Sequence, residues 1–350
     1  MTVKRNYGID LLRLVFMYMI CLLHTLSHGG IISACLVGGA EYKVYSLVKV
    51  FTLCAVDGFA IISGYMANDK PRKYSKIVDM WFQAIFYSFI LTVILMLAGF
   101  GEGITLKVLF KNAFPIIFKK YWYFYSYVLL FFAAPMLNKY LFSVDENTAK
   151  KVIILLVVLF SVAGILKDTF EVQKGYSALW LIVLYCIGVL AKRIKIFEEK
   201  KTPVLIALFL LCNLISWGAY IFAGVDLIIS YVSPTVLLSG LILVVLFSRL
   251  QFKGGVISKL SPLAFGVYLF QINKIVWEVF LKKTFAFVAQ YNIAAGVLCA
   301  FGIAFCIFAA GLAIEFIRSK IAKLIRLHSL SEAIVRLADK AMMKVSVLMK

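Results

Sequence analysis

The sequence predicts an all-α, polytopic membrane protein with about ten transmembrane helices and both termini in the cytoplasm. Hydrophobic residues make up 63% of the 350 residues, whereas soluble domains average about 45–50%. The mean hydropathy is +0.97. The apolar residues are gathered in segments of the length that crosses a bilayer, about 20 residues. The basic residues lie in the short breaks between these segments, as the positive-inside rule expects of a membrane protein.

Ten apolar segments follow one another along the chain, and each is predicted to cross the membrane. They are residues 8–28, 45–66, 77–99, 121–141, 151–167, 176–192, 203–223, 232–249, 261–281 and 291–317. The glycine-rich stretch 29–40 either extends the first segment or re-enters the membrane. A retained first helix fits better than a signal peptide, because no small-residue cleavage site follows it.

The distribution of charge predicts the orientation. With the N-terminus inside, most lysines and arginines between the segments fall on the cytoplasmic side. The basic C-terminal residues then lie on the same side as the N-terminus, which requires an even number of spans. We therefore expect a membrane domain over residues 1–318 and a basic, amphipathic cytoplasmic tail over 319–350. The tail is predicted to lie on the anionic inner leaflet; a solvated basic tail is the alternative.

The composition also argues against other classes of partner. The net charge of +20 is explained by topology, and the basic residues are not interleaved with aromatic ones on one face, so no nucleic-acid partner is expected. The seven cysteines stand singly and the three histidines have no partner at ligand spacing. We therefore expect neither a disulfide framework nor a bound metal.

The first segment carries a polar stripe through its apolar sequence. Asp10, Arg13, His24 and His28 recur at helical spacing and share one face. Ionisable residues within a membrane usually face the interior of a bundle or a wet cavity, so they are candidates for function. Asp10 is predicted to cap the helix. The simpler alternatives are that His24 bonds to a neighbouring helix and that Arg13 anchors the helix at the interface.

Three further groups of charges interrupt the apolar segments. Asp57 lies in the middle of the second segment, two turns after Lys49 on the same face. A basic cluster at the start of the third segment is either an anion-binding site or only a marker of the cytoplasmic side. Lys274 and Glu278 have the spacing of a helical ion pair; the alternative is that they bind a ligand. The basic cluster at the start of the third segment comprises Arg72, Lys73 and Lys76.

Several motifs, taken in order, resemble one family. Arg13 is followed by ten residues and His24, behind an Ile-Asp-Leu-Leu-Arg start. The segments Phe59-Ala-Ile-Ile-Ser-Gly-Tyr65 and Tyr121-Trp-Tyr123, with a later Pro-Met-Leu-Asn at 135–138, also match. The chain is similar over residues 5–318 to membrane-bound acyltransferase family 3. Where the family often has Arg-x-x-Arg, this chain has Lys73 and Lys76, and it has Gln271 where many relatives place a histidine.

The resemblance implies a multi-pass protein of the bacterial plasma membrane that O-acylates surface carbohydrates. It implies an acyl-CoA donor, with acetyl-CoA the usual one, and a glycan or glycolipid acceptor. The alternative is a transporter or flippase for a polysaccharide precursor, without acyl transfer. A glycan polymerase is disfavoured, because the large charged outer loop expected of one is missing from the sequence.

The chemistry then assigns roles to residues. His24 has an unperturbed pKa near neutrality and suits a general base; whether it also carries the acyl group is open. Asp57 would orient His24 or would serve as a structural partner of Lys49 or Arg13. Arg13 lies about 16 Å from His24 along a helix, at 1.5 Å per residue. The donor's phosphates would rest near Arg13, Arg72, Lys73 and Lys76.

Overall fold

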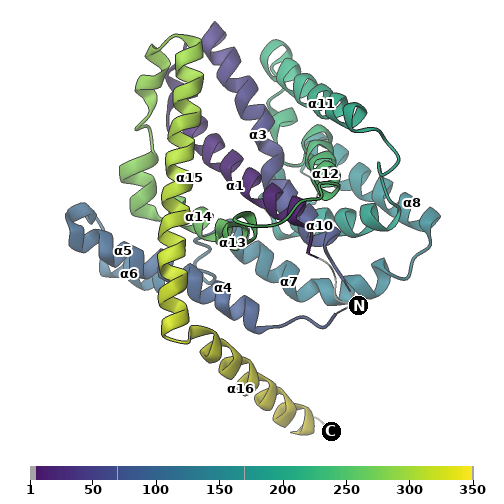
Figure 1. Cartoon of the computed structure of the whole chain (residues 1–350), viewed down its shortest axis with the longest axis vertical. Coiled ribbons are helices and arrows are strands. Elements are labelled where there is room, and N and C mark those ends of the chain that lie inside the picture. Colours follow the sequence, from purple (N-terminus) through teal and green to yellow (C-terminus); the bar gives the residue numbers. More distant parts are fainter. Residues whose placement is uncertain (1–4, 69, 169, 349–350) are drawn as a thin grey trace.

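The computed structural model describes residues 5–68, 70–168 and 170–348, and these residues form helices and loops without a β-strand (Figure 1). Within them, seven helical segments are long and apolar enough to cross a membrane, and a helix pair bent by 82° makes an eighth. The all-helical membrane character is therefore confirmed, but the predicted count of ten is not. The cytoplasmic location of the termini stays a prediction.

The two remaining predicted spans are helices that fall short of a full apolar crossing. Helix α10 (Ala178–Arg193) is apolar but has only 16 residues. Helix α7 (Trp122–Leu141) has 20 residues, but aromatic and polar side chains fill its first turns and Asn138 and Lys139 its end. Both helices are nevertheless central to the bundle, because α10 packs on α3 (Ala40–Tyr65) and on α7.

Helix α1 (Tyr7–Ser27) lies at the centre of the bundle. It packs against α3, α12 (Pro234–Ser248), α14 (Ala264–Gln271) and α15 (Ile293–Leu324). Most of its residues are buried, and the buried ones include Asp10 as well as both isoleucines and all leucines but Leu11. A polar stripe on such a helix faces protein and not lipid, which is the arrangement expected of ionisable groups in a membrane.

The outer helices present apolar side chains to the surroundings. Helix α11 (Thr202–Ala223), α15 and the segment that starts with α8 (Glu146–Leu156) are largely exposed. Leu298 on α15, for example, is 73% exposed. In a membrane protein such side chains contact lipid, so these helices form the perimeter around α1, α3 and α10.

Three of the predicted spans contain π-helical turns, which are rare and interrupt the regular ladder of backbone hydrogen bonds; one of the three is the broken span described below. The third span consists of α4 (Ser75–Ile85), η1 (Phe86–Ile90), α5 (Leu91–Leu95) and η2 (Met96–Phe100). The fifth consists of α8, η3 (Val157–Val162) and α9 (Ala163–Leu166).

The predicted span 261–281 is broken. Its first part is α13 (Ile257–Leu260), η6 (Ser261–Leu263) and α14, and its second part is η7 (Val276–Leu281) and η8 (Ala286–Gln290). At the break, Oδ1 of Asn273 accepts hydrogen bonds from the backbone N–H groups of Ile275 and Val276 at 2.9 and 3.2 Å. Asn273 therefore caps the second part.

This break overturns the predicted ion pair between Lys274 and Glu278. Lys274 begins the second part, but residues 276–281 after it form a π-helix, so the two residues do not share a continuous α-helical face. Glu278 instead pairs with Lys282 one turn further on, at 2.7 Å. The i, i+4 rule failed because it assumes an unbroken α-helix.

The loops at the two ends of the bundle carry short helices. The stretch 29–40 contains α2 (Ile31–Ala34) and pairs with the end of the broken span: Lys283 and Phe285 donate backbone hydrogen bonds to His28 and Gly29, at 2.8 and 2.9 Å. Helices α1 and α2 together form one apolar span, Tyr7–Ala34, so the first part of the stretch extends the first span. The other short helices are α6 (Leu106–Ala113), η4 (Gln173–Gly175) and η5 (Asp226–Ile229).

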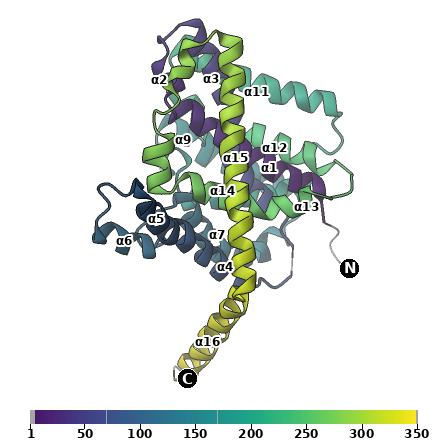
Figure 2. The ribbon, with the colours of Figure 1, turned by 60° about the vertical axis from the view of Figure 1, so that its left-hand side comes forward.

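The C-terminal part of the chain forms two helices, and the boundary predicted at residue 318 falls inside the first of them. Helix α15 continues past residue 318 to Leu324, and α16 (Leu327–Leu348) then projects away from the bundle (Figures 1 and 2). Its start is held by Asp79 of α4, which accepts a hydrogen bond from Ser331 at 2.6 Å and lies 2.8 Å from Nδ1 of His328. Residues 349–350 of the tail lie outside the described residues, and its place on a membrane surface stays a prediction.

Candidate functional site

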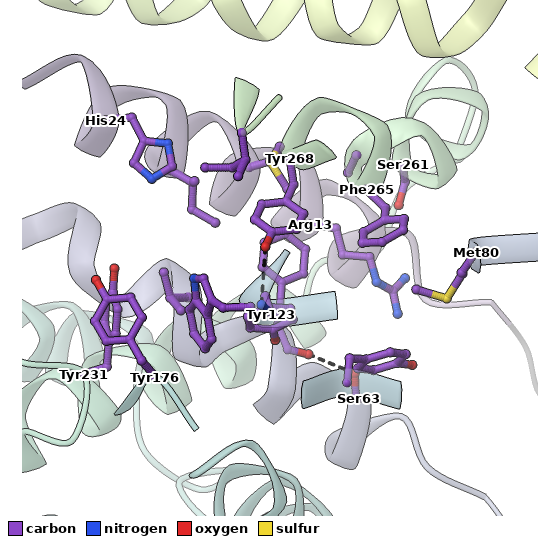
Figure 3. A pocket seen from close by; sticks show the side chains of 18 of the residues that line it. Arg13, His24, Ser63, Met80, Tyr123, Tyr176, Tyr231, Ser261, Phe265 and Tyr268 are labelled. Carbon is purple, nitrogen blue, oxygen red and sulfur yellow. Dashed lines mark hydrogen bonds between the residues drawn. The ribbon is translucent and has the colours of Figure 1, made fainter. Parts of the chain in front are cut away.

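A cavity of about 440 Å³ runs beside α1, between this helix, α3, α7 and α14. Arg13 lines it at one end and His24 at the other (Figure 3). Met17 and Ile20 line it between them. His28 also lines it, with its ring centroid 5.6 Å from that of His24. These residues are the predicted stripe of α1, because positions three and four apart in a helix lie one above another on a single face.

The start of α1 is fixed by Asn6. Its side-chain oxygen accepts a hydrogen bond from the backbone N–H of Ile9 at 3.1 Å, so Asn6 is the N-cap and the prediction that Asp10 caps the helix is wrong. Asp10 lies within the first turn, buried, where a carboxylate still interacts favourably with the helix dipole.

At the Arg13 end, Asp10 binds two guanidinium groups. Nη1 of Arg13 lies 2.7 Å from Asp10, and Arg5 contacts the other carboxylate oxygen. The side chain of Arg13 is 33% exposed although that of Asp10 is 4% exposed. One carboxylate between two arginines leaves a net positive charge at this end. Arg5 and Arg13 also line a hollow of about 380 Å³ that adjoins the cavity.

At the other end, His24 has a partner on α14. Its Nδ1 lies 2.9 Å from Oε1 of Gln271. With the amide in this orientation the oxygen can only accept, so Nδ1 carries the proton and Nε2 keeps its lone pair. The ring of Trp277 stands edge-on to His24, with ring centroids 5.3 Å apart. These contacts with Gln271 and Trp277 hold the imidazole ring in one orientation.

Aromatic side chains form most of the cavity wall between the two ends. Tyr268 accepts a hydrogen bond from the backbone N–H of Tyr123 at 3.3 Å and thereby joins α14 to α7 (Figure 3). Ser63 donates to the carbonyl of Phe59 in its own helix at 2.9 Å, so its hydroxyl serves α3 itself. The aromatic lining residues are Phe59, Trp122, Tyr123, Tyr127, Tyr176, Tyr231, Phe265, Tyr268 and Trp277.

Within the part of the chain that the structure describes, Asp57 forms no hydrogen bond with His24. It is 1% exposed, and its Oδ1 accepts a hydrogen bond from Nε1 of Trp180 at 3.0 Å. Its other oxygen has no hydrogen-bond partner among the described residues. Neither of the predicted structural partners, Lys49 and Arg13, forms an ion pair with it in the described part of the chain. The catalytic role of Asp57 stays a prediction.

The basic cluster at 72–76 is likewise not part of the cavity lining. Arg72 donates to the carbonyl of Phe131 and to the hydroxyl of Tyr185, at 3.3 and 3.2 Å, and its guanidinium lies 5.0 Å from the Phe131 ring centre. It lines a separate hollow of about 480 Å³. Lys73 and Lys76 are exposed where α4 begins. Their binding of donor phosphates stays a prediction.

Gln271, Trp277 and the tyrosines Tyr176 and Tyr231 are site residues that the sequence did not single out for chemistry. Gln271 was visible only as a departure from a related pattern. The others look like ordinary aromatic residues of apolar segments, and only the fold brings them to the cavity. Among the described residues, no three His, Cys, Asp or Glu side chains gather into a group that could hold a metal ion.

Fold and cavity together define a multi-pass membrane protein with an internal, aromatic-walled site that carries an arginine and a histidine at opposite ends. The family model described as an acyltransferase domain, that of acyltransferase family 3, matches residues 6–314. The chain therefore belongs to acyltransferase family 3 and is a membrane acyltransferase. Searches of curated proteins and of solved structures find no match.

Proposed function

We propose that this protein transfers an acyl group, by expectation acetyl, from cytoplasmic acyl-CoA to a hydroxyl of a cell-surface or lipid-linked glycan. The observation that carries the proposal is that Arg13 and His24 line opposite ends of the same cavity. The parts of an acyl-CoA follow the same order along its length: charged phosphates at one end, a long thin arm, and the thioester at the other end.

The donor would lie along the cavity. Its phosphates would meet the guanidinium of Arg13, which suits phosphate because of its planar fork of N–H donors. Arg72, Lys73 and Lys76 would attract the same phosphates from the surface. The pantetheine arm would pass the aromatic wall, and the thioester would reach His24, about 16 Å from Arg13 along α1.

The transfer step uses His24 as a general base. Nε2 of His24 takes the proton from the acceptor hydroxyl as its oxygen attacks the thioester carbonyl carbon. The new C–O bond forms, the C–S bond breaks, and the CoA thiolate leaves. The imidazolium of His24 then returns the proton to this thiolate, so that the products are an ester and CoA with a free thiol. The bond between Nδ1 and Gln271 supports this role, because it leaves Nε2 free.

The competing function is transport of a polysaccharide precursor without acyl transfer. A cavity open to both sides would serve either function, whereas a histidine fixed by a side-chain partner favours chemistry. Asp57, placed beside Trp180, would act on the site only through packing of α3 and α10 unless its carboxylate moves.

Membrane vesicles that contain the full chain and radiolabelled acetyl-CoA test the proposal. We expect label in the glycan fraction with the wild type and loss of transfer in His24→Ala, with impaired donor use in Arg13→Ala. Transfer that survives His24→Ala contradicts the mechanism, and no transfer from any acyl-CoA favours the transporter.

A further inference from the structure

A second pocket, of about 310 Å³, meets the main cavity at His24. His24, His28, Tyr176 and Tyr231 line both spaces. The second pocket therefore gives access to the same imidazole without passing Arg13. If the donor fills the main cavity, this pocket is a route by which another molecule can bring a hydroxyl to His24.

Lys49 is the most unusual residue of this pocket. It belongs to the membrane helix α3, and no carboxylate of the described residues lies within 4.0 Å of its ammonium group. The ring centre of Tyr220 lies 6.0 Å from the ammonium. A cation in a membrane helix without an ion-pair partner is costly, which makes it a candidate for binding an anionic ligand.

The other lining residues suit a sugar. Lys174 adds a second cation and Asp226 a single carboxylate, so the charged side chains of the pocket sum to a positive charge. The buried hydroxyl of Ser27 has no hydrogen-bond partner among the described residues. Tyr176 and Tyr231, with ring centroids 5.0 Å apart, offer apolar faces beside these polar groups. A few polar groups on an aromatic wall are typical of small-molecule sites.

We propose that this pocket is the acceptor site and that it selects a glycan unit bearing an anionic group, a carboxylate or a phosphate. Lys49 and Lys174 hold the anion, Asp226 and Ser27 bind sugar hydroxyls, and one further hydroxyl points at His24. This inference rests on the proposed function for the role of His24, but binding of the anionic sugar does not require turnover.

The test measures binding by the full chain purified in detergent, from the shift of its thermal unfolding midpoint with ligand concentration. The probes are methyl β-glucuronide, glucose 1-phosphate and the neutral methyl β-glucoside. We expect at least one anionic sugar to bind about tenfold more tightly than the neutral one, as a charge-assisted hydrogen bond provides. His24→Ala is expected to keep this preference.

Variants of the lysines test which side chains produce the preference for the anionic sugar. Lys49→Met is expected to abolish it, whereas Lys49→Arg keeps the charge and retains it. Lys43→Met is the matched control, because Lys43 is on the same helix but does not line the pocket. Lys174→Met, in the short helix η4, is expected to weaken the preference and provides a second test if Lys49→Met does not fold.

Equal binding of neutral and anionic sugars overturns the inference, as does a preference unchanged in both lysine variants. Inorganic phosphate that binds as tightly as glucose 1-phosphate also overturns it, because the site would then recognise only the anion. Failure of the proposed function has a different signature: anionic sugars bind through Lys49, but no label passes from acetyl-CoA to any acceptor.

Discussion

Gln271 lies 2.9 Å from Nδ1 of His24, although 247 residues separate the two in the chain. The contact exists because α14 ends at Gln271, immediately before the break in the span. Asn273 then caps the helical part that follows the break. The amide of Gln271 also lies 3.9 Å from the sulfur of Met17 on α1, so it is held between the two helices. The partner of the predicted base is therefore a neutral amide of α14 and not the carboxylate of α3.

This contact predicts a marked loss of activity in Gln271→Leu. Without an acceptor beside Nδ1, the ring no longer has one fixed tautomer, and changes of this kind typically cost about 10–100-fold. The measurement is the initial rate of label transfer from acetyl-CoA in vesicles. Gln271→Glu keeps an acceptor oxygen and should retain more activity than the leucine variant. A wild-type rate in Gln271→Leu would show that the amide does not orient His24.

Arg13 predicts a different kinetic effect, because it lies at the end of the cavity away from His24. We expect Arg13→Met to raise the KM for acetyl-CoA by about tenfold or more, since a charge-assisted contact to phosphate is lost. Arg13→Lys keeps the charge without the planar fork of N–H donors, so its KM for acetyl-CoA should lie between those of the wild type and Arg13→Met.

The exposed lysines Lys73 and Lys76 are the comparison for Arg13. Their double replacement by methionine should raise the same KM by less than about threefold, and the effect should shrink in high salt, because exposed charges are screened. A larger effect from the lysine pair than from Arg13 would place the donor's phosphates at the surface and not in the cavity.

The sequence predicted the stripe of α1 correctly because regular helical spacing determines which side chains share a face. The family pattern, the helical class and the membrane character followed from local composition and order. The break after Gln271 did not, since Gln271, Lys274 and Glu278 have the spacing of one face of an unbroken helix. Consequently the contact of His24 with Gln271 and the ion pair of Glu278 with Lys282 were both missed.

Asp57 shows that the sequence also does not reveal the neighbours of a polar residue it singles out. A carboxylate in a membrane span is a sound candidate for function, but the sequence cannot say which helix lies beside it. Packing of α10 on α3 supplies Trp180 as its donor. Likewise Arg72 finds carbonyl and hydroxyl partners on α7 and α10 that no local pattern announces.

The contact with Trp180 predicts that Asp57→Asn is mild. An asparagine side chain still offers an oxygen to Nε1 of Trp180, whereas Asp57→Leu leaves this buried donor unsatisfied at a cost of about 1–3 kcal/mol. We expect Asp57→Asn to keep transfer activity within about tenfold of wild type and Asp57→Leu to lower the protein's thermal stability. A loss of several orders of magnitude in Asp57→Asn, with unchanged stability, would show instead that the carboxylate takes part in catalysis.

The last prediction concerns the packing that positions Trp180. Helices α3 and α10 approach so closely at Gly188 that a β-carbon there would lie 2.3 Å from the carbonyl oxygen of Ile61, which is backbone and cannot rotate away. Gly188→Ala must therefore separate the helices, at about 1–3 kcal/mol. The matched control is Gly218→Ala in α11, where a β-carbon meets nothing within 4 Å. At one fixed scan rate in detergent, we expect the Gly188 variant to unfold about 2–6 °C lower and the Gly218 variant to be unchanged or slightly more stable, because alanine favours a helix. Equal midpoints for the two variants would mean that α3 and α10 are not in close contact at Gly188.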